Sequence, residues 1–225
     1  MKRPVLAIFP FIIALILCFA ASPAPQAAAT GGYDVMSAEP VMHVGMHVIF
    51  ERTAAGASAG GKWHVTVQSV SYPEWVEISW VWPRSDGTLP SATIRRINGL
   101  ERGRTFGPVF GMRDAIDTDS TAPWVSREVL RELRTGKVAY NFKMGSVSVT
   151  GILAGDLKVE EEVLFPVDVN GRRVFLPAYK CAKGQLIIWN NMQNPLVLEY
   201  RPIGVPLITG VLGWRAESIS IMGEV

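Results

Sequence analysis

The chain has 225 residues, of which 48% are hydrophobic and 19% are charged, a composition typical of folded globular proteins. An intrinsically disordered chain would contain fewer apolar residues and a higher net charge. The 21 Gly and 15 Pro residues show no Gly-X-Y repeat, so a collagen-like fibre is excluded. A chain of this length is expected to form one domain or at most two.

The N-terminal segment 1–29 has the pattern of a Sec-type signal peptide. Two basic residues precede an uncharged, mostly apolar stretch, and Ala27 and Ala29 fit the small-x-small rule for signal peptidase. We therefore expect cleavage after Ala29 and a mature chain, residues 30–225, that is periplasmic or secreted. The alternative is an uncleaved N-terminal membrane anchor. No transmembrane segment is expected in the mature chain.

Removal of this segment changes both the charge and the cysteine content. Loss of Lys2 and Arg3 lowers Lys+Arg from 22 to 20, which equals the number of Asp+Glu residues. A neutral mature chain has no global basic field, so we expect no nucleic-acid partner. Loss of Cys18 leaves Cys181 without an intramolecular disulfide partner, and the pattern around Cys181 predicts a small buried residue.

Apolar and polar residues alternate along most of the mature chain, which is typical of antiparallel strands with one wet face. Asn170-Gly171 lies between two strand-like segments and predicts a hairpin with a type I′ turn. A strand near the start of the mature chain is predicted to have one face formed by Met42, Val44, Met46, Val48 and Phe50. A later strand is predicted to have one face formed by Val138, Tyr140, Phe142 and Met144.

A single short helix is predicted at 126–135, with Ser126 as its N-cap and Gly136 as its C′ residue. Short strands at regular spacing together with this helix predict a mostly β fold, either an antiparallel sandwich or an incomplete barrel. We expect one β-rich domain over residues 30–225. A long irregular excursion at 84–124, with TIRRI as a short strand-like segment, interrupts this domain.

The motifs in the sequence do not supply a complete catalytic or metal site. Residues 56–60 match G-x-S-x-G, but strands flank them and no helix follows, so they predict a hairpin loop rather than a nucleophile elbow. Asp114, Asp117 and Asp119 lack the glycine and the ligand spacing of a calcium loop, and they predict a solvated turn. We expect no catalytic residues, no metal and no cofactor.

The three histidines are interpreted as surface residues. Alternation places His43 and His47 on one strand face, with the neighbouring methionines opposite, and His64 in a partner strand. Exposed strand histidines are the expectation, and a two-histidine metal site is the alternative.

A local cluster of basic residues is formed by Arg95, Arg96, Arg102, Arg104 and Arg113. This cluster predicts a solvated loop, and the alternative is that it contacts phosphorylated lipid or glycan head groups.

The most distinctive segment is YPEWVEISWVWP, which holds three of the seven tryptophans of the chain. Alternation places Trp80 and Trp82 on one face of a strand and Trp75 on the other. Such rings are usually core residues, but they also form apolar cavity walls and sugar-stacking platforms. Trp75, Trp80 and Trp82 are therefore the candidate ligand-binding residues.

Three segments resemble a recurring exported bacterial β-rich domain family that has no assigned activity. They are APWVSREVLRELRTG, VDVNGRRVFLPA and NNMQNPLVLEYRP, all in the second half of the chain. A capped helix, an Asn-Gly hairpin and an Asn-Pro-Leu turn are structural features. The resemblance therefore implies a bacterial envelope protein and assigns no catalytic residues.

Together these patterns predict an exported bacterial envelope protein that acts as a non-enzymatic module. Its ligand would be an amphiphile, a glycan or a partner protein. The alternative is an extracytoplasmic hydrolase whose acids come from the Asp114 loop and from Glu161. Glu161 interrupts the apolar alternation of its strand, so it either points inward or marks a β-bulge. The absence of a nucleophile–base pair or phosphate loop in the sequence favours the binding module.

Overall fold

The computed structural model describes residues 34–54, 57–81, 88, 91–107, 114–118, 120–144, 153–202 and 213–221. The predicted signal peptide 1–29, with the cleavage residues Ala27 and Ala29, lies outside the described residues, and so does Trp82. The chain divides into two compact units, Met1–Gly32 and Tyr33–Val225, and every described residue belongs to the second unit. None of the helices in the described part is long and apolar enough to cross a membrane.

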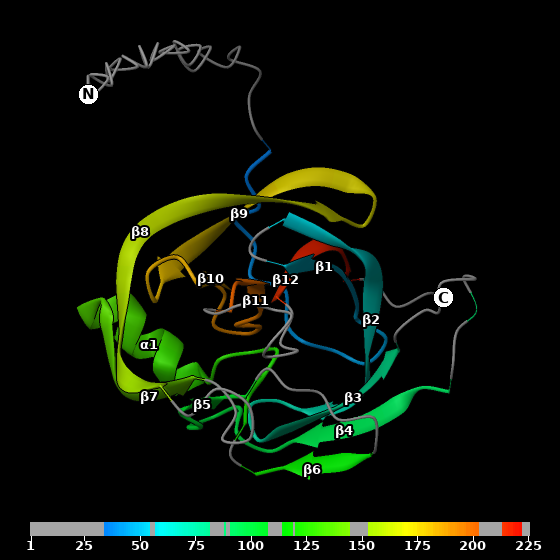
Figure 1. Ribbon diagram of the computed structural model, residues 1–225, viewed down its shortest axis with the longest axis horizontal. Helices are drawn as coiled ribbons and strands as arrows, with labels where there is room; N and C mark the ends of the chain where they lie inside the picture. The colour runs from blue at the N-terminus through cyan, green and yellow to red at the C-terminus, as the bar shows by residue number, and fades with distance from the viewer. Residues whose placement is uncertain are drawn as a thin grey trace, which may run out of the picture. The chain divides into compact units, whose positions relative to one another are not determined.

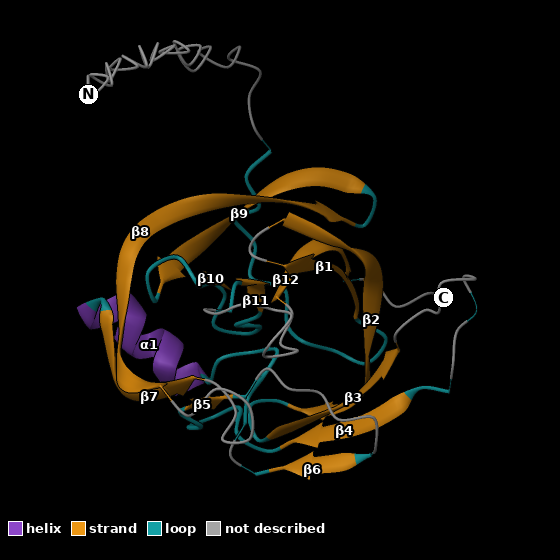
Figure 2. Cartoon of the chain, in the orientation of Figure 1, coloured by secondary structure: helices purple, strands orange, loops and turns teal. Residues whose placement is uncertain are grey.

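The fold is mostly β, as predicted: the described residues form one mixed, mostly antiparallel sheet of twelve strands and one helix (Figure 2). The helix α1 spans Arg127–Gly136. The strands are β1 (His47–Ala54), β2 (Ala57–Ser71), β3 (Trp75–Val81), β4 (Thr93–Ile97), β5 (Thr105–Phe106), β6 (Ala115–Asp117), β7 (Val138–Met144), β8 (Leu153–Val169), β9 (Arg172–Cys181), β10 (Leu186–Trp189), β11 (Val197–Tyr200) and β12 (Gly213–Ser220).

Strand β12 closes part of the sheet into a ring (Figure 1). Its first half pairs with β11 through Trp214 and Arg215, and its second half pairs in parallel with β8 through Ser218 and Ile219. Strands β8 to β12 therefore form a closed circuit, which corresponds to the incomplete-barrel alternative. From β12 the sheet continues through β1, β2, β3, β4 and β6.

The local turn and cap signals of the sequence are confirmed, with a shift of one residue at the helix end. Asn170 and Gly171 have φ angles of 49° and 77°, the positive values of a type I′ turn, and they join β8 to β9. The Oγ of Ser126 accepts a hydrogen bond from the Val129 backbone amide at 3.3 Å, as an N-cap does. The left-handed residue after α1 is Lys137, and not Gly136 as predicted.

One residue on each of two predicted strand faces is exposed instead of buried, because a backbone irregularity breaks the alternation there. Gly45 has a φ of 84° in a turn, so β1 begins at His47 and Val44 is 59% exposed instead of buried. Asn141 has a φ of 55° where the pairing of β7 with β8 shifts register. This bulge turns Tyr140 outward, where it is 59% exposed.

The excursion predicted at 84–124 contributes strands at both ends of the sheet. TIRRI forms β4, which pairs with β3, and β6 pairs in parallel with β4 as one end strand. Strand β5 pairs in parallel with β7 as the other end strand. The region is therefore less irregular than predicted. It ends two residues before Ser126, the N-cap of α1, and this helix lies against β7 (Figure 1).

An aromatic cluster fills the inner side of β1, β2 and β12. The rings of Phe50 and Trp63 stack with centroids 4.6 Å apart, and Trp214 meets Trp63 edge-on at 5.4 Å. Tyr200 of β11 lies 4.9 Å from Trp214. Aromatic side chains bury large apolar areas and lock the geometry of a core, so this cluster joins the ring to the extended sheet.

Candidate functional site: a groove on β3, β4 and β6

An open groove of about 470 Å³ lies on the outer face of the three strands at one end of the sheet. Its lining combines two carboxylates, one guanidinium and two isoleucine side chains. The residues are Glu77 of β3, Ile94 and Arg96 of β4, and Asp114, Ala115 and Ile116 at β6. Charged groups and apolar side chains within one groove are typical of a surface that binds a ligand with both polar and apolar parts.

The strand register explains why these side chains meet. Glu77 pairs with Arg96 across β3 and β4, and Arg96 pairs with Ile116 across β4 and β6. Side chains of paired residues lie on the same face of a sheet, and their neighbours along the strand lie on the other. Accordingly Val76 and Ile78 are fully buried on the opposite face, whereas Ile116 is 68% exposed.

Trp75 holds Arg96 at the margin of this groove. The guanidinium carbon of Arg96 lies 4.1 Å from the centroid of the Trp75 ring, within the range of a cation–π contact. Trp75 was predicted as a direct ligand contact, and it does not line the groove itself. Its position indicates a supporting role, since the stacked ring restricts the rotamers of the arginine.

Strand β6 is fastened to β4 by polar contacts on both of its faces. Asp114 Oδ1 accepts a hydrogen bond of 2.8 Å from the Ile94 backbone amide. On the other face Arg95 Nη2 donates to Asp117 Oδ1 at 3.0 Å, and both side chains are largely shielded from solvent. These contacts hold a strand of three residues in place. The shape of the groove therefore does not depend on strand pairing alone.

The other predicted tryptophans do not line this groove. Trp80 is 3% exposed and belongs to the hydrophobic core on the inner face of β3. Trp82 lies outside the described residues.

The two acids of the hydrolase alternative are not brought together. Glu161 lies on β8, where the pairing with β9 shifts register, and its carboxylate forms a 3.1 Å ion pair with exposed Lys180. Asp114 precedes β6, which is separated from β8 by several strands in the sheet order. The bulge explanation for Glu161 therefore fits the structure, and the inward-pointing one does not.

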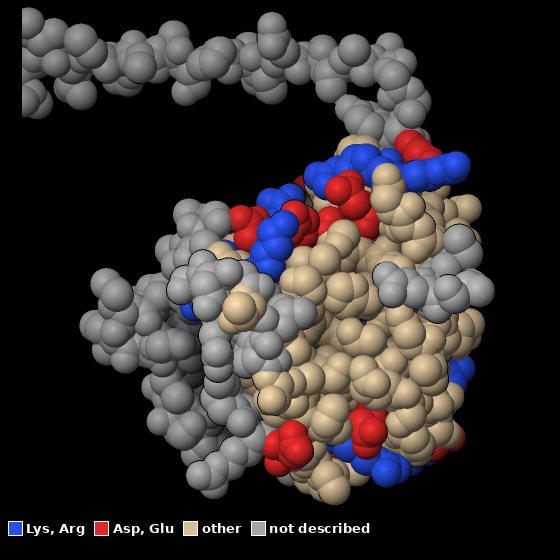
Figure 3. All heavy atoms as spheres, turned by 90° about the vertical axis from the view of Figure 1, so that its right-hand side faces the viewer, with Lys and Arg blue, Asp and Glu red and all other residues tan. Residues whose placement is uncertain are grey.

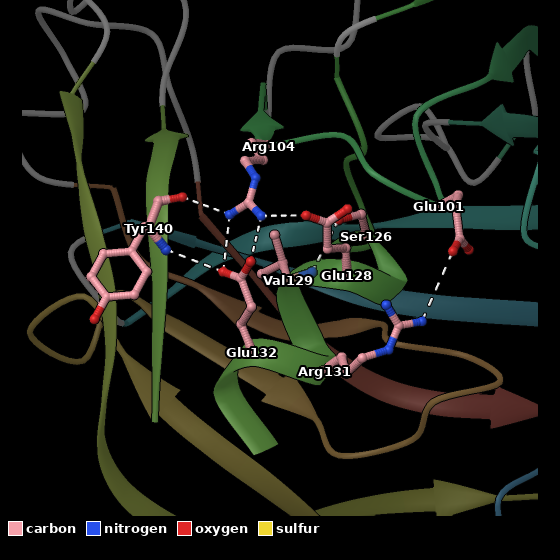
Figure 4. Close-up of polar contacts among 8 residues, drawn as sticks. All are labelled: Glu101, Arg104, Ser126, Glu128, Val129, Arg131, Glu132 and Tyr140. Atoms are coloured by element: carbon pink, nitrogen blue, oxygen red, sulfur yellow. Dashed lines mark hydrogen bonds and ion pairs between the residues drawn. The ribbon is translucent and has the colours of Figure 1, made fainter. Parts of the chain in front are cut away.

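Arginines of the predicted basic cluster have different partners, and Arg104 has the most elaborate set (Figure 4). Its Nη2 donates to Glu128 and to Glu132, each at 2.5 Å, and its Nη1 donates to Glu132 at 3.0 Å and to the Tyr140 carbonyl at 2.6 Å. Glu132 also accepts a hydrogen bond from the Tyr140 backbone amide at 3.2 Å. This network connects the start of β5 to α1 and β7.

The electrostatics of this network indicate a structural role. Hydrogen bonds from Arg104 hold the pKa of Glu132 below its usual range, and the hydrogen bonds of the two carboxylates raise the pKa of Arg104. Glu128 and Glu132 are four residues apart on a helix, where like charges repel each other unless a cation lies between them. The guanidinium of Arg104 therefore forms its hydrogen bonds with groups within the fold.

Two of the remaining sequence candidates for chemistry, Ser58 and Cys181, are among the described residues. Ser58 of the G-x-S-x-G match pairs with Thr53 in a β1–β2 hairpin, so no strand-to-helix elbow forms. Cys181 is fully buried, and burial followed by the charge of Glu160 raises its pKa to about 12. Asp119 and Arg113 lie outside the described residues. The described residues contain no group of three metal-ligating side chains.

The surface seen in Figure 3 carries charges of both signs. Basic and acidic side chains gather along its upper and lower margins, and the described surface between them is largely uncharged. On this face, therefore, no broad area of one charge sign is visible.

Sequence reasoning missed the groove because two of its features are not local. The alternation in TIRRI places Ile94 and Arg96 on one face, but no pattern in the sequence predicts that Ile116 lies beside them in a parallel pair. The solvated turn predicted for the aspartates is wrong for Asp117, which lies in β6 and pairs with Arg95. Asp114 is exposed, and its carboxylate also accepts a hydrogen bond from the neighbouring strand.

Comparison of the chain with protein-family models, curated proteins and solved structures gave no match.

Proposed function

We propose that this protein is an exported, non-enzymatic binding module of the bacterial envelope, and that the groove on β3, β4 and β6 binds a neutral glycan. The observation that supports the ligand class is the lining of the groove, in which carboxylates, a guanidinium and exposed isoleucines surround one open volume. The proposed compartment rests on the signal-peptide pattern of residues 1–29.

The chemistry of the lining matches a polyhydroxylated ligand. The carboxylates of Glu77 and Asp114 accept hydrogen bonds from hydroxyl groups, and Arg96 donates them. Ile94 and Ile116 offer apolar contact to the C–H faces of sugar rings. Two negative charges and one positive charge leave the groove slightly acidic, which disfavours phosphate or carboxylate ligands and favours uncharged ones.

Preorganisation supports binding over catalysis as the role of this groove. Trp75 holds the guanidinium of Arg96, and the Ile94 amide holds the carboxylate of Asp114. Groups whose rotamers are fixed before binding lose less entropy when the ligand arrives. The hydrolase alternative needs Glu161 beside the Asp114 loop, and Glu161 lies on a distant strand of the sheet.

The proposal is tested by titrating the purified protein with a panel of neutral bacterial oligosaccharides while tryptophan emission is recorded. We expect saturable binding by at least one oligosaccharide, and a loss of affinity of about tenfold or more for Arg96→Ala and for Asp114→Asn. Matched controls are Arg131→Ala and Glu161→Gln, which remove an exposed arginine and an exposed acid outside the groove. Both controls should bind as the unmodified protein does.

A parallel titration with phosphatidylethanolamine vesicles distinguishes glycan from lipid. Binding to vesicles alone would replace the glycan by an amphiphile as the ligand class. If neither probe changes the emission, or if the control variants lose as much affinity as the groove variants, the groove is not the binding site.

A further inference from the structure

Two of the three histidines lie side by side on a different part of the sheet. His47 is the first residue of β1 and pairs with Thr66, whereas His64 of β2 pairs with Ile49, so the two histidines are diagonal neighbours on one face. Their ring centroids are 5.2 Å apart, and the ring planes are inclined by 37°. The buried neighbours Val48 and Val65 show that this is the outer face of the sheet.

The separation of the two rings matches that of two imidazoles that share one metal ion. A metal–nitrogen bond is about 2.1 Å long, and a ring nitrogen lies about 1.1 Å from its ring centre. Two such ligands at the tetrahedral angle have centroids about 5.2 Å apart, and a square-planar arrangement brings them to about 4.5 Å. The geometry points to a binding site for a divalent first-row transition metal, Cu²⁺ or Zn²⁺, formed by His47 and His64.

The cation nearest in sequence to His64 is held in an ion pair. Lys62 itself forms a 2.6 Å ion pair with Glu217, which offsets the repulsion that this lysine would exert on a bound cation.

The composition of the site sets the affinity order among metals. The described residues supply no third histidine, cysteine or acid to form a three-ligand group with the pair, so water completes the coordination. A site of two nitrogen ligands and water follows the general order in which Cu²⁺ binds more tightly than Zn²⁺ or Ni²⁺. This site is separate from the proposed glycan groove, which is formed by β3, β4 and β6.

The chain offers a matched control for the test. His43 precedes the turn at Gly45, and its Nδ1 lies 2.8 Å from the carbonyl oxygen of Val44, so it is a histidine outside the proposed pair. Equilibrium dialysis of the full chain against Cu²⁺, and separately against Zn²⁺, should give one bound ion that depends on the pair. We expect His47→Ala and His64→Ala each to weaken binding at least tenfold, and His43→Ala to change it less than twofold.

A spectroscopic measurement identifies the ligands independently of affinity. Electron paramagnetic resonance of the Cu²⁺-loaded protein should show hyperfine coupling to two nitrogens, and to one fewer in His47→Ala. Circular dichroism confirms that each variant is folded. An ion bound elsewhere in the chain would bind equally well in the His47 and His64 variants, and that result would overturn the proposal. Equal loss in His43→Ala, or no bound ion at 100-fold molar excess of metal, would overturn it as well.

Discussion

The indole N–H of Trp124 donates a 2.8 Å hydrogen bond to Asn194 Oδ1, and both side chains are buried. The same asparagine donates through Nδ2 to the sulfur of Met46 at 3.3 Å. Backbone bonds continue the contact, because Val125 donates to the Pro195 carbonyl and Val197 to the Pro123 carbonyl. The segment before α1 is thereby joined to the turn before β11 and to the segment that leads into β1.

Asn194→Ala is expected to lower the free energy of unfolding by about 1–3 kcal/mol, because it leaves the buried indole N–H without its acceptor. Asn98→Ala is the control, since Asn98 is exposed and substitution there should change stability by less than about 0.5 kcal/mol. Urea unfolding followed by circular dichroism measures both values. Equal effects of the two substitutions would show that the buried hydrogen bond contributes nothing to stability.

Arg104→Gln is expected to lower the free energy of unfolding by roughly 1–3 kcal/mol. This loss is smaller than the sum of the hydrogen bonds that Arg104 forms, because its side chain is 26% exposed and solvent screens the charges. The substitution leaves Glu128 and Glu132 to repel each other on α1. Arg131→Gln, on the same helix, breaks only an exposed 3.9 Å contact with Glu101 and should cost less than about 0.5 kcal/mol. Urea unfolding of the two variants compares the costs directly.

Lowering the pH should remove part of the stability that the Arg104 network provides, because Glu132 becomes protonated. Its folded pKa is lowered, so its contribution is fully present above its unfolded pKa of about 4.3 and declines as the pH falls through the folded value. Glu132→Gln should therefore reduce stability at pH 7 and flatten the decline between pH 5 and pH 3. The measurement is the urea midpoint at several pH values. An unchanged acid slope in this variant would contradict the role assigned to the carboxylate.

Trp80 and Trp75 should respond differently to substitution, although both lie on β3. Trp80→Ala removes a buried ring and should cost about 3–5 kcal/mol. Trp75→Ala should cost less than about 1 kcal/mol and should weaken glycan binding in the titration described above by releasing Arg96. A Trp80→Ala protein of unchanged stability would mean that this ring is not part of the core.

Cys181 should not react with thiol reagents while the protein is folded. Full burial and a pKa raised to about 12 keep it as an inaccessible thiol at pH 8. Iodoacetamide labelling read by peptide mass spectrometry should modify Cys181 in 8 M urea but not in native buffer. Rapid labelling of the native protein would show that β9 opens readily.

Local signals in the sequence predicted those parts of the fold that depend on neighbouring residues. The Asn170-Gly171 turn and the Ser126 cap each follow from the conformational preference of one or two residues, and the alternation of apolar side chains identified most strands. At Gly45 and Asn141 a residue with positive φ interrupts the alternation, and the side chain just before it, Val44 or Tyr140, is exposed instead of buried.

Only the tertiary structure decided which distant residues meet. Strand β4 pairs in parallel with β6, and β8 pairs in parallel with β12. No turn joins these strands directly, so the sequence between them does not indicate which residues pair. Those pairings place Ile116 beside Arg96 and close the ring. The neighbours His47 and His64 likewise depend on the register of β1 and β2, and alternation within one strand favoured His43 as the partner of His47. A strand's own period determines which face a side chain takes, and the register between strands determines its neighbour.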